Sequence, residues 1–281
     1  MRAHEIETRI NAILKPEYGN PSETDNGILF GDREREVRRM AVCWSPTEQV
    51  LREAVALGAQ AVFSHEIPFI PCGEAASELW NIPPQADIPA NVKRRKIYEE
   101  TGLVLFKYHY PLDGWPVWGM PRALASALGF DPGKAEWVNR FVPVFDFQPQ
   151  SLWGFSQHVR SSLGMTGIDI AGDLDRKVSR VALMVGGFAV RLWISEFARQ
   201  AGADVMVVGE MLDYTARAAR EADIAVIKAS HYATENPAVI RFAEYLQAQT
   251  RDKLEVMYLP TGDSWEHFGH AGIEKGNENE V

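Results

Sequence analysis

Two ten-residue segments match each other without a gap, and this repeat constrains the fold more than any other feature. LGAQAVFSHE runs from Leu57 to Glu66, and AGADVMVVGE runs from Ala201 to Glu210. Each reads as a helix end, a glycine turn, a short apolar strand and an acidic residue. The match predicts two related α/β lobes. The alternative is that Gly-Ala before small apolar residues is a common form of any helix-to-strand turn.

A second repetition places a histidine and an acid four residues apart in each half of the chain. His109 and Asp113 lie in KYHYPLD, and His231 and Glu235 lie in SHYATE. Each pair follows a short apolar run that predicts a buried strand, and ligands of open α/β sheets bind where such strands end. We therefore expect the lobes to face each other across a pseudo-two-fold axis, with a site in the cleft between them.

The residues expected at that cleft carry imidazoles and carboxylates. They are His65, Glu66, His109, Asp113, Glu210, His231 and Glu235. Such groups bind transition metals when they come from separate elements, and a pair of ions is usually joined by a bridging carboxylate. Glu235 is the candidate bridge, because Thr234 as a cap and Pro237 in the first turn would stiffen the start of a helix expected over 237–249. One such residue alone would more often be an ordinary surface group.

Seven segments spread over nearly the whole chain resemble, in order, the Nif-three-like family of dinuclear-metal proteins, also known as type 2 GTP cyclohydrolase I homologues. They are DNGILFGD, ALGAQAVFSHEIPFI, YHYPLDGW, GMPRALASALGF, ALMVGGFA, AGADVMVVGE and SHYATE. At this length the chain is similar to the shorter members, which lack an inserted domain between the halves. The resemblance also implies a homo-oligomer, a ring-shaped hexamer built from dimers.

By position, the resemblance implies that His65 and His231 bind one metal ion, that Asp113 binds the other, and that Glu235 bridges both. The family usually has two adjacent histidines where this chain has a histidine followed by Glu66, so the second ligand becomes a carboxylate. Two divalent ions (Fe, Mn, Zn or Mg) are implied, and an oxygen-rich shell favours manganese, iron or magnesium over zinc. The change also leaves open that this chain holds one ion or none.

His109 and Glu210 are expected to lie behind the ligands and orient them, because such outer groups often matter nearly as much as the ligands themselves. Lys107 and Lys228 each precede a candidate histidine. They either balance the charge of an anionic substrate or extend from strand ends into solvent. Trp115 and Trp118, just beyond Asp113, either stack on a planar substrate such as a purine or fill a gap between the lobes or at a subunit contact.

Two classes of function fit these residues. The first is a metal-dependent hydrolase, in which a water held by the metal ions attacks a C–N, phosphoryl or acyl bond of a small molecule such as a nucleotide. Glu66 or Glu210 would then accept the proton. The second is a non-catalytic protein that binds metal for delivery, sensing or assembly, or an adaptor that lost its metal through the change at Glu66. Loss of turnover in His231→Ala with the fold intact would favour the first.

Composition narrows the partners and the compartment. The net charge of -9 argues against a broad nucleic-acid-binding surface, which needs clustered Lys and Arg. The only cysteines, Cys43 and Cys72, form no CxxC motif, which indicates a reducing compartment and no thiolate metal site. No apolar stretch approaches the roughly 20 residues of a membrane span. We therefore expect a cytoplasmic protein that does not cross a membrane.

The order of the predicted elements places the first lobe at residues 1–147 and the second at 148–262. A strand over 256–259 is expected to complete the sheet of the second lobe. The tail over 263–281, rich in Glu, Asn and Gly, is expected to be largely disordered.

Overall fold

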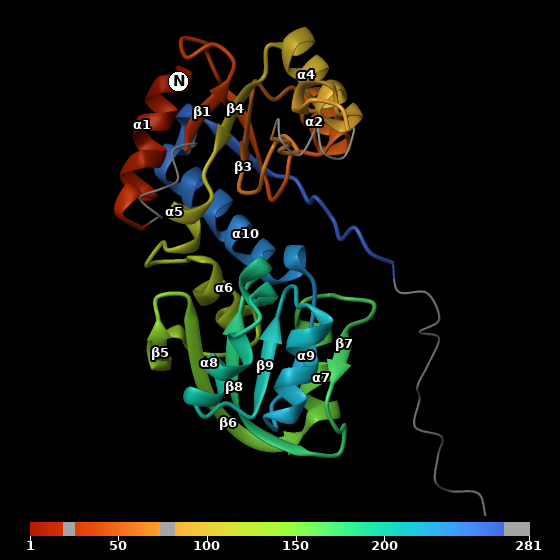
Figure 1. Ribbon diagram of the computed structural model, residues 1–281. Coiled ribbons are helices and arrows are strands. Elements are labelled where there is room, and N and C mark those ends of the chain that lie inside the picture. The colour runs from red at the N-terminus through yellow and green to blue at the C-terminus, as the bar shows by residue number, and fades with distance from the viewer. Residues whose placement is uncertain (19–25, 74–81, 267–281) are drawn as a thin grey trace, which may run out of the picture. The chain divides into compact units, whose positions relative to one another are not determined.

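The computed structural model describes residues 1–18, 26–73 and 82–266, and the chain forms two compact units (Figure 1). The first comprises Met1–Pro143 and Glu235–Thr261, and the second comprises Val144–Thr234 and Gly262–Val281. The mixed α/β class expected from the sequence is confirmed, with two sheets. The lobe boundaries drawn at 147 and 262 and the pseudo-two-fold relation stay predictions. Most of the expected disordered tail, 267–281, lies outside the described residues.

The first sheet has the strand order β1-β4-β3-β2-β11. Its strands are β1 (Gly27–Phe30), β2 (Arg39–Cys43), β3 (Ala61–Ser64), β4 (Val104–Lys107) and β11 (Glu255–Tyr258). Neighbouring strands are parallel except β1, which pairs antiparallel with β4. The associated helices are α1 (Ala3–Ile13), α2 (Glu48–Ala56), α4 (Pro89–Thr101), α5 (Tyr110–Asp113), α6 (Met120–Ala127) and most of α10 (His231–Thr250).

Both faces of the first sheet are covered, which explains why its central strands are apolar throughout rather than alternating. All four residues of β3 are buried. Val62 belongs to a core cluster with Leu51 of α2 and Tyr98 of α4. On the opposite face, the ring of Phe63 lies 4.3 Å from that of Phe242 on α10. The sheet is therefore enclosed between helices, and its functional groups lie at the strand ends.

The second sheet has the order β5-β6-β8-β9-β10-β7. Its strands are β5 (Glu136–Asn139), β6 (Val142–Ser151), β7 (Asp169–Ala171), β8 (Lys177–Met184), β9 (Val205–Val208) and β10 (Ala225–Lys228). The helices that accompany it are α7 (Leu152–Ser162), α8 (Ile194–Gln200) and α9 (Asp213–Glu221), and α8 packs beside α9.

The two sheets share part of their topology. Three consecutive parallel strands, β2-β3-β4 or β8-β9-β10, are flanked by an earlier strand, β1 or β7, that pairs antiparallel with the last of the three. In the repeat itself, Gly58 and Gly202 adopt left-handed φ values of 75° and 67° between helix and strand. Glycine populates this region without the cost that a Cβ imposes, so the same residue ends both helices.

Two expectations about individual elements are wrong. The strand near residue 256 does not complete the second sheet but joins the first as the parallel neighbour of β2. Helix α10 begins at His231 and not at Pro237, which lies inside the helix. The cap is Ser230, whose hydroxyl accepts from the N–H of Ala233 at 3.0 Å, whereas Thr234 lies in the first turn.

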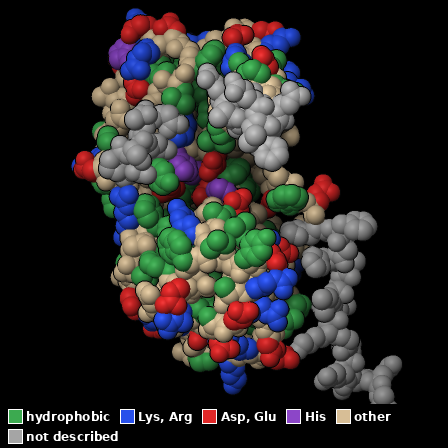
Figure 2. All heavy atoms as spheres, in the orientation of Figure 1, with side chains coloured by type: hydrophobic (Ala, Val, Ile, Leu, Met, Phe, Trp, Pro, Cys, Tyr) green, Lys and Arg blue, Asp and Glu red, His purple; other side chains and the backbone are tan. Residues whose placement is uncertain are grey.

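Among the described residues, no helix is both long and apolar enough to cross a bilayer. On the face that Figure 2 shows, acidic and basic side chains are interspersed with hydrophobic ones. Both signs of charge are thus present on this face, as expected from a chain with 29 Lys and Arg and 38 Asp and Glu residues.

Candidate metal centre

Five of the predicted site residues come together in the first unit, and we call them the His65 cluster. They are His65, Glu66, His109, Asp113 and Glu235. The first two follow β3 directly. His109 precedes α5, Asp113 is the last residue of α5, and Glu235 lies on α10. The parallel strands β3 and β4 are neighbours, so their carboxyl ends bring these segments to one edge of the sheet.

His65 is at the centre of the cluster and is completely buried. Its Nδ1 lies 3.3 Å from the carbonyl oxygen of Tyr108. A carbonyl can only accept, so the neutral form of this imidazole carries its proton on Nδ1 and keeps its lone pair on Nε2. The backbone therefore fixes the tautomer that a metal ligand requires.

Three carboxylates surround that nitrogen. His65 Nε2 lies 3.4 Å from Glu235 Oε2, 3.5 Å from Asp113 Oδ1 and 4.0 Å from Glu66 Oε1. Both Nε2 and Asp113 Oδ1 are buried and make no hydrogen bond to any described part of the chain. Buried polar atoms without hydrogen bonds are rare, and a bound cation would satisfy both. The cluster therefore fits a divalent metal ion.

The pKa of the Asp113 carboxyl also supports a bound cation. Burial raises the pKa of the Asp113 carboxyl to about 6, with Glu235 and Glu66 adding to the rise and His65 and His109 opposing it. The dominant cause is removal of the carboxylate from water. A cation next to this carboxyl would restore its ionised form.

The ligand atoms fall into two sets that share one histidine. His65, His109 and Asp113 form one set, and His65, Glu66 and Glu235 form the other, with the ligand atoms of each set within 4.8 Å of one another. Only Nε2 of His65 is available, since Nδ1 is engaged with a carbonyl. One ion can therefore use this nitrogen, and a second ion would depend on the remaining ligands.

Neighbouring groups hold the cluster in place. The indole Nε1–H of Trp44 donates to Glu235 Oε2 at 2.8 Å. The backbone N–H of His109 donates to Asn26 Oδ1 at 3.1 Å. The imidazole Nε2 of His109 lies 3.5 Å from Glu66 Oε1. Sequence reasoning missed Trp44, although its place directly after β2, a third parallel strand ending at the same edge, is the signal that would have found it.

Close backbone packing shapes the segment that carries Asp113. A Cβ on Gly119 would lie 2.4 Å from the carbonyl oxygen of Asp113, and one on Gly114 would lie 2.0 Å from that of Tyr18. Trp115 between them is buried and packs edge-on against aromatic rings of α10. Trp115 therefore lies in the core of the first unit, a place that neither interpretation had given it.

The second unit holds the other predicted residues. Glu210 follows β9, and its Oε1 lies 3.3 Å from Nδ1 of His231, the first residue of α10. A Cβ on Gly187 would come within 3.4 Å of Glu210 Oε2, so glycine leaves room for this pair. His231 and Glu235 are one helical turn apart and therefore lie on the same side of α10. The expectation that His231 precedes the helix is wrong.

The two units thus carry an equivalent Glu–His pair. Glu66 and Glu210 occupy matching places after β3 and β9, and His109 and His231 follow β4 and β10. The position that matches His65 is Gly209, where a Cβ would lie 2.5 Å from the carbonyl oxygen of Gly186. The second copy has no room for an imidazole, so only the first unit builds a buried histidine at this place.

Comparisons with known proteins agree with this architecture. The sequence model of the Duf34/NIF3 (NGG1p interacting factor 3) family matches residues 1–263. A relative from Escherichia coli K12, called GTP cyclohydrolase 1 type 2 homolog, is 28% identical over 264 residues, covering 90% of this chain and 96% of its own. A relative from Pseudomonas aeruginosa with the same name is 28% identical over 227 residues, covering 79% and 83%.

Solved structures show the same fold. A Bacillus cereus protein related to NIF3 superposes with a TM-score of 0.75 at 16% identity, covering 95% of this chain and 99% of that protein. A hypothetical protein from Staphylococcus aureus gives a TM-score of 0.76 at 17% identity, with the same coverage. At these identities the likeness establishes the fold alone.

Proposed function

Because the chain belongs to the Duf34/NIF3 family, we propose that it is a metal-dependent hydrolase with a centre of two divalent metal ions. The observation that carries the proposal is the buried Nε2 of His65, which faces three carboxylates without a hydrogen bond to the described chain. A site of this composition holds several negative charges in a buried setting, and such charges need a cation.

The proposed ligands are His65, Glu66, Asp113, His231 and Glu235, with Glu235 as the bridge. Helix α10 carries two of them one turn apart, and the Trp44 indole fixes one oxygen of Glu235. His109 and Glu210 act behind the ligands, each paired with a partner in its own unit. The predominance of oxygen favours manganese, iron or magnesium over zinc.

When bound, divalent ions lower the pKa of a coordinated water and polarise a substrate oxygen. The chain itself would supply the proton acceptor. Glu66 suits this role where it is not a ligand, because its Oε1 lies 3.5 Å from His109 Nε2, which can take the proton further. Glu210, half-exposed and 3.3 Å from His231, is the corresponding group of the second unit.

A nucleotide or related molecule with a C–N or phosphoryl bond is the proposed substrate class. The support is the name of the relatives, GTP cyclohydrolase 1 type 2 homolog. A screen of nucleoside triphosphates and phosphoesters with manganese-loaded protein tests this. Turnover that disappears in Glu235→Ala and persists in Glu244→Ala, an exposed carboxylate on the same helix, supports the hydrolase; identical rates in both variants contradict it.

A non-catalytic metal-binding role is the second candidate, and one observation favours it. The cluster alone offers five possible ligands, of which His65 and Glu235 are buried and Glu66, His109 and Asp113 are partly buried. A shell filled by protein atoms leaves no position for substrate. Water exchange, measured by proton relaxation on the manganese-loaded protein, separates the two roles: a catalytic site exchanges water and a saturated one does not.

We also propose a homo-oligomer, with a ring-shaped hexamer as the expected form, located in the cytoplasm. Exposed apolar side chains on the second unit support an oligomer. Leu192 is 62% exposed, Trp193 57% and Tyr214 74%. The free cysteines Cys43 and Cys72 support a reducing compartment. Light scattering should give the mass of six chains, reduced in Trp193→Ser; a monomer at micromolar concentration would contradict the oligomer.

A further inference from the structure

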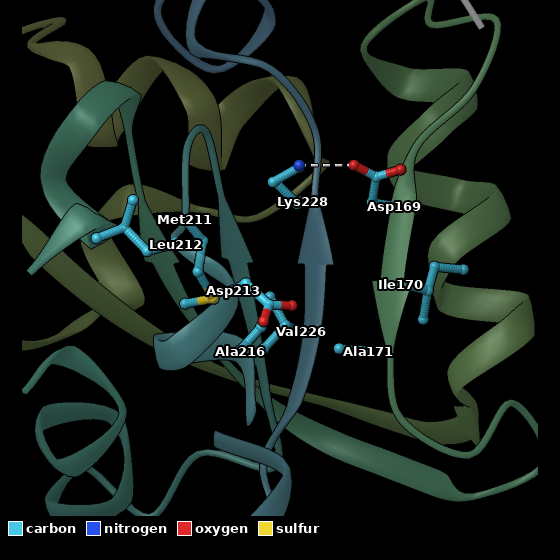
Figure 3. Close-up of a pocket in the computed structure, with 9 residues that line it drawn as sticks. All are labelled: Asp169, Ile170, Ala171, Met211, Leu212, Asp213, Ala216, Val226 and Lys228. Carbon is cyan, nitrogen blue, oxygen red and sulfur yellow. Dashed lines mark ion pairs between the residues drawn. The ribbon is translucent and has the colours of Figure 1, made fainter. Parts of the chain in front are cut away.

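The second unit contains a hollow of about 210 Å³ that the metal centre does not use (Figure 3). Its walls come from β7, β10, α9 and the loop before α9. Met211, Leu212 and Val226 make it largely apolar, and Ala216 of α9 lines it with only a methyl group. Lys228 and Asp169 extend toward each other from neighbouring strands at one end (Figure 3).

The hollow adjoins the Glu210–His231 pair along the chain. Met211 directly follows Glu210 at the carboxyl end of β9, and Lys228 ends β10 three residues before His231. Ligands of parallel α/β sheets bind at this end of the strands. The hollow is therefore lined by segments that continue into Glu210 and His231, residues that the proposed function uses.

The polar end restricts what the hollow can bind. Lys228 Nζ and Asp169 Oδ2 form an ion pair at 2.7 Å, and their side chains are 38% and 62% exposed. A simple anion would compete with Asp169 for the ammonium, and a simple cation would compete with Lys228 for the carboxylate. A neutral group that presents an acceptor beside a donor can bond to both without separating the charges.

We propose that this hollow binds a small planar ring with a cis-amide edge. The ring carbonyl accepts from Lys228, the adjacent ring N–H donates to Asp169, and the flat apolar face lies against Met211, Leu212 and Val226. Small-molecule sites commonly combine apolar walls with a few placed polar groups in this way. The role of the hollow as a substrate subsite rests on the proposed function, whereas the binding itself does not.

The test uses the full chain freed of metal by EDTA, with 2-pyridone as the probe. N-methyl-2-pyridone is the matched control, because it keeps the ring and the carbonyl but lacks the N–H. Amide chemical-shift mapping should place 2-pyridone at residues 211–216 and 226–228 with the millimolar affinity expected of a fragment. Binding of the N-methyl compound should be about three- to tenfold weaker, the usual effect of one lost hydrogen bond.

Two variants and a control complete the design. Asp169→Ala should weaken 2-pyridone by a similar factor, and Ala216→Met should fill the hollow and abolish binding. Glu196→Gln, which changes an exposed carboxylate on α8, should have no effect. Equal binding of the two probes, or binding that survives both hollow variants, overturns the proposal. Because metal is absent throughout, failure here is distinguishable from failure of the metal centre.

Discussion

Replacing Asp113 by asparagine should stabilise the metal-free protein while abolishing its response to metal. Burial raises the pKa of this carboxyl from 3.8 to about 6, so the folded state disfavours its ionised form. The folded chain therefore binds more protons than the unfolded chain between these values, and stability falls as pH rises through them. The penalty is absent below the lower value and complete above the upper one.

The size of the effect follows from the same values. A rise from 3.8 to about 6 corresponds to a penalty of up to about 3 kcal/mol at pH 8 and about half of that at pH 5. Asparagine carries no charge at any of these pH values and keeps the shape of the side chain. Asp113→Asn should therefore raise the unfolding free energy in EDTA by up to these amounts.

Urea denaturation in EDTA at pH 5 and pH 8 measures both differences. Asp252→Asn, at an exposed aspartate, is the control and should change stability by less than about 0.5 kcal/mol. With excess manganese the order should reverse, because the wild type gains about 4.1 kcal/mol at a metal concentration about 1,000 times the dissociation constant, which exceeds the penalty at pH 8, and the variant gains little. A metal-free variant no more stable than wild type at pH 8 would refute the reasoning.

Three further substitutions test the surroundings of the site. Trp44→Phe removes the hydrogen bond to Glu235 and should weaken metal binding about 10- to 100-fold in titration calorimetry; unchanged affinity would show that the indole does not position this carboxylate. Gly114→Ala places a methyl group against the Tyr18 carbonyl and should cost about 1–3 kcal/mol in urea denaturation, so a neutral result would contradict the tight packing. Thr234→Val leaves a backbone N–H of the η4 turn (Gly186–Val190) without its acceptor and should cost a similar amount; a stable variant would argue against this link.

Much of the fold follows from local sequence patterns. The apolar runs that became β3, β4, β9 and β10 are short and continuous, as buried parallel strands are, and glycines at 58 and 202 end the preceding helices. These signals depend on neighbours along the chain. They predicted the α/β class directly.

The wrong predictions concern elements whose placement depends on residues far away in the sequence. The strand β11 satisfies its hydrogen bonds beside β2, more than 200 residues away, and nothing in its own sequence names that partner. Helix α10 starts early because Ser230 caps it, while Thr234 and Pro237 offered a competing start signal four residues later. The hydroxyl of Thr234 accepts instead from the N–H of Gly186 at 3.0 Å, so Ser230 is the residue that caps the helix.

The candidate site shows the same division. Strand ends predicted which histidines and acids lie at the sheet edge, and five of them meet in the first unit. The distances, the buried state of His65 and the contribution of Trp44 depend on side-chain packing between elements far apart in sequence. The sequence alone therefore pointed to the edge but not to the arrangement of the ligands.

The most direct test of the metal centre is the metal content of the untagged protein. Elemental mass spectrometry would compare wild type with Glu235→Ala and with Glu244→Ala, which removes an exposed carboxylate from the same helix. We expect near two metal ions per chain in wild type and in the control, and a sharp fall in Glu235→Ala. Protein that is isolated without metal and takes up no added manganese, iron or zinc would contradict the metal centre and the hydrolase built on it.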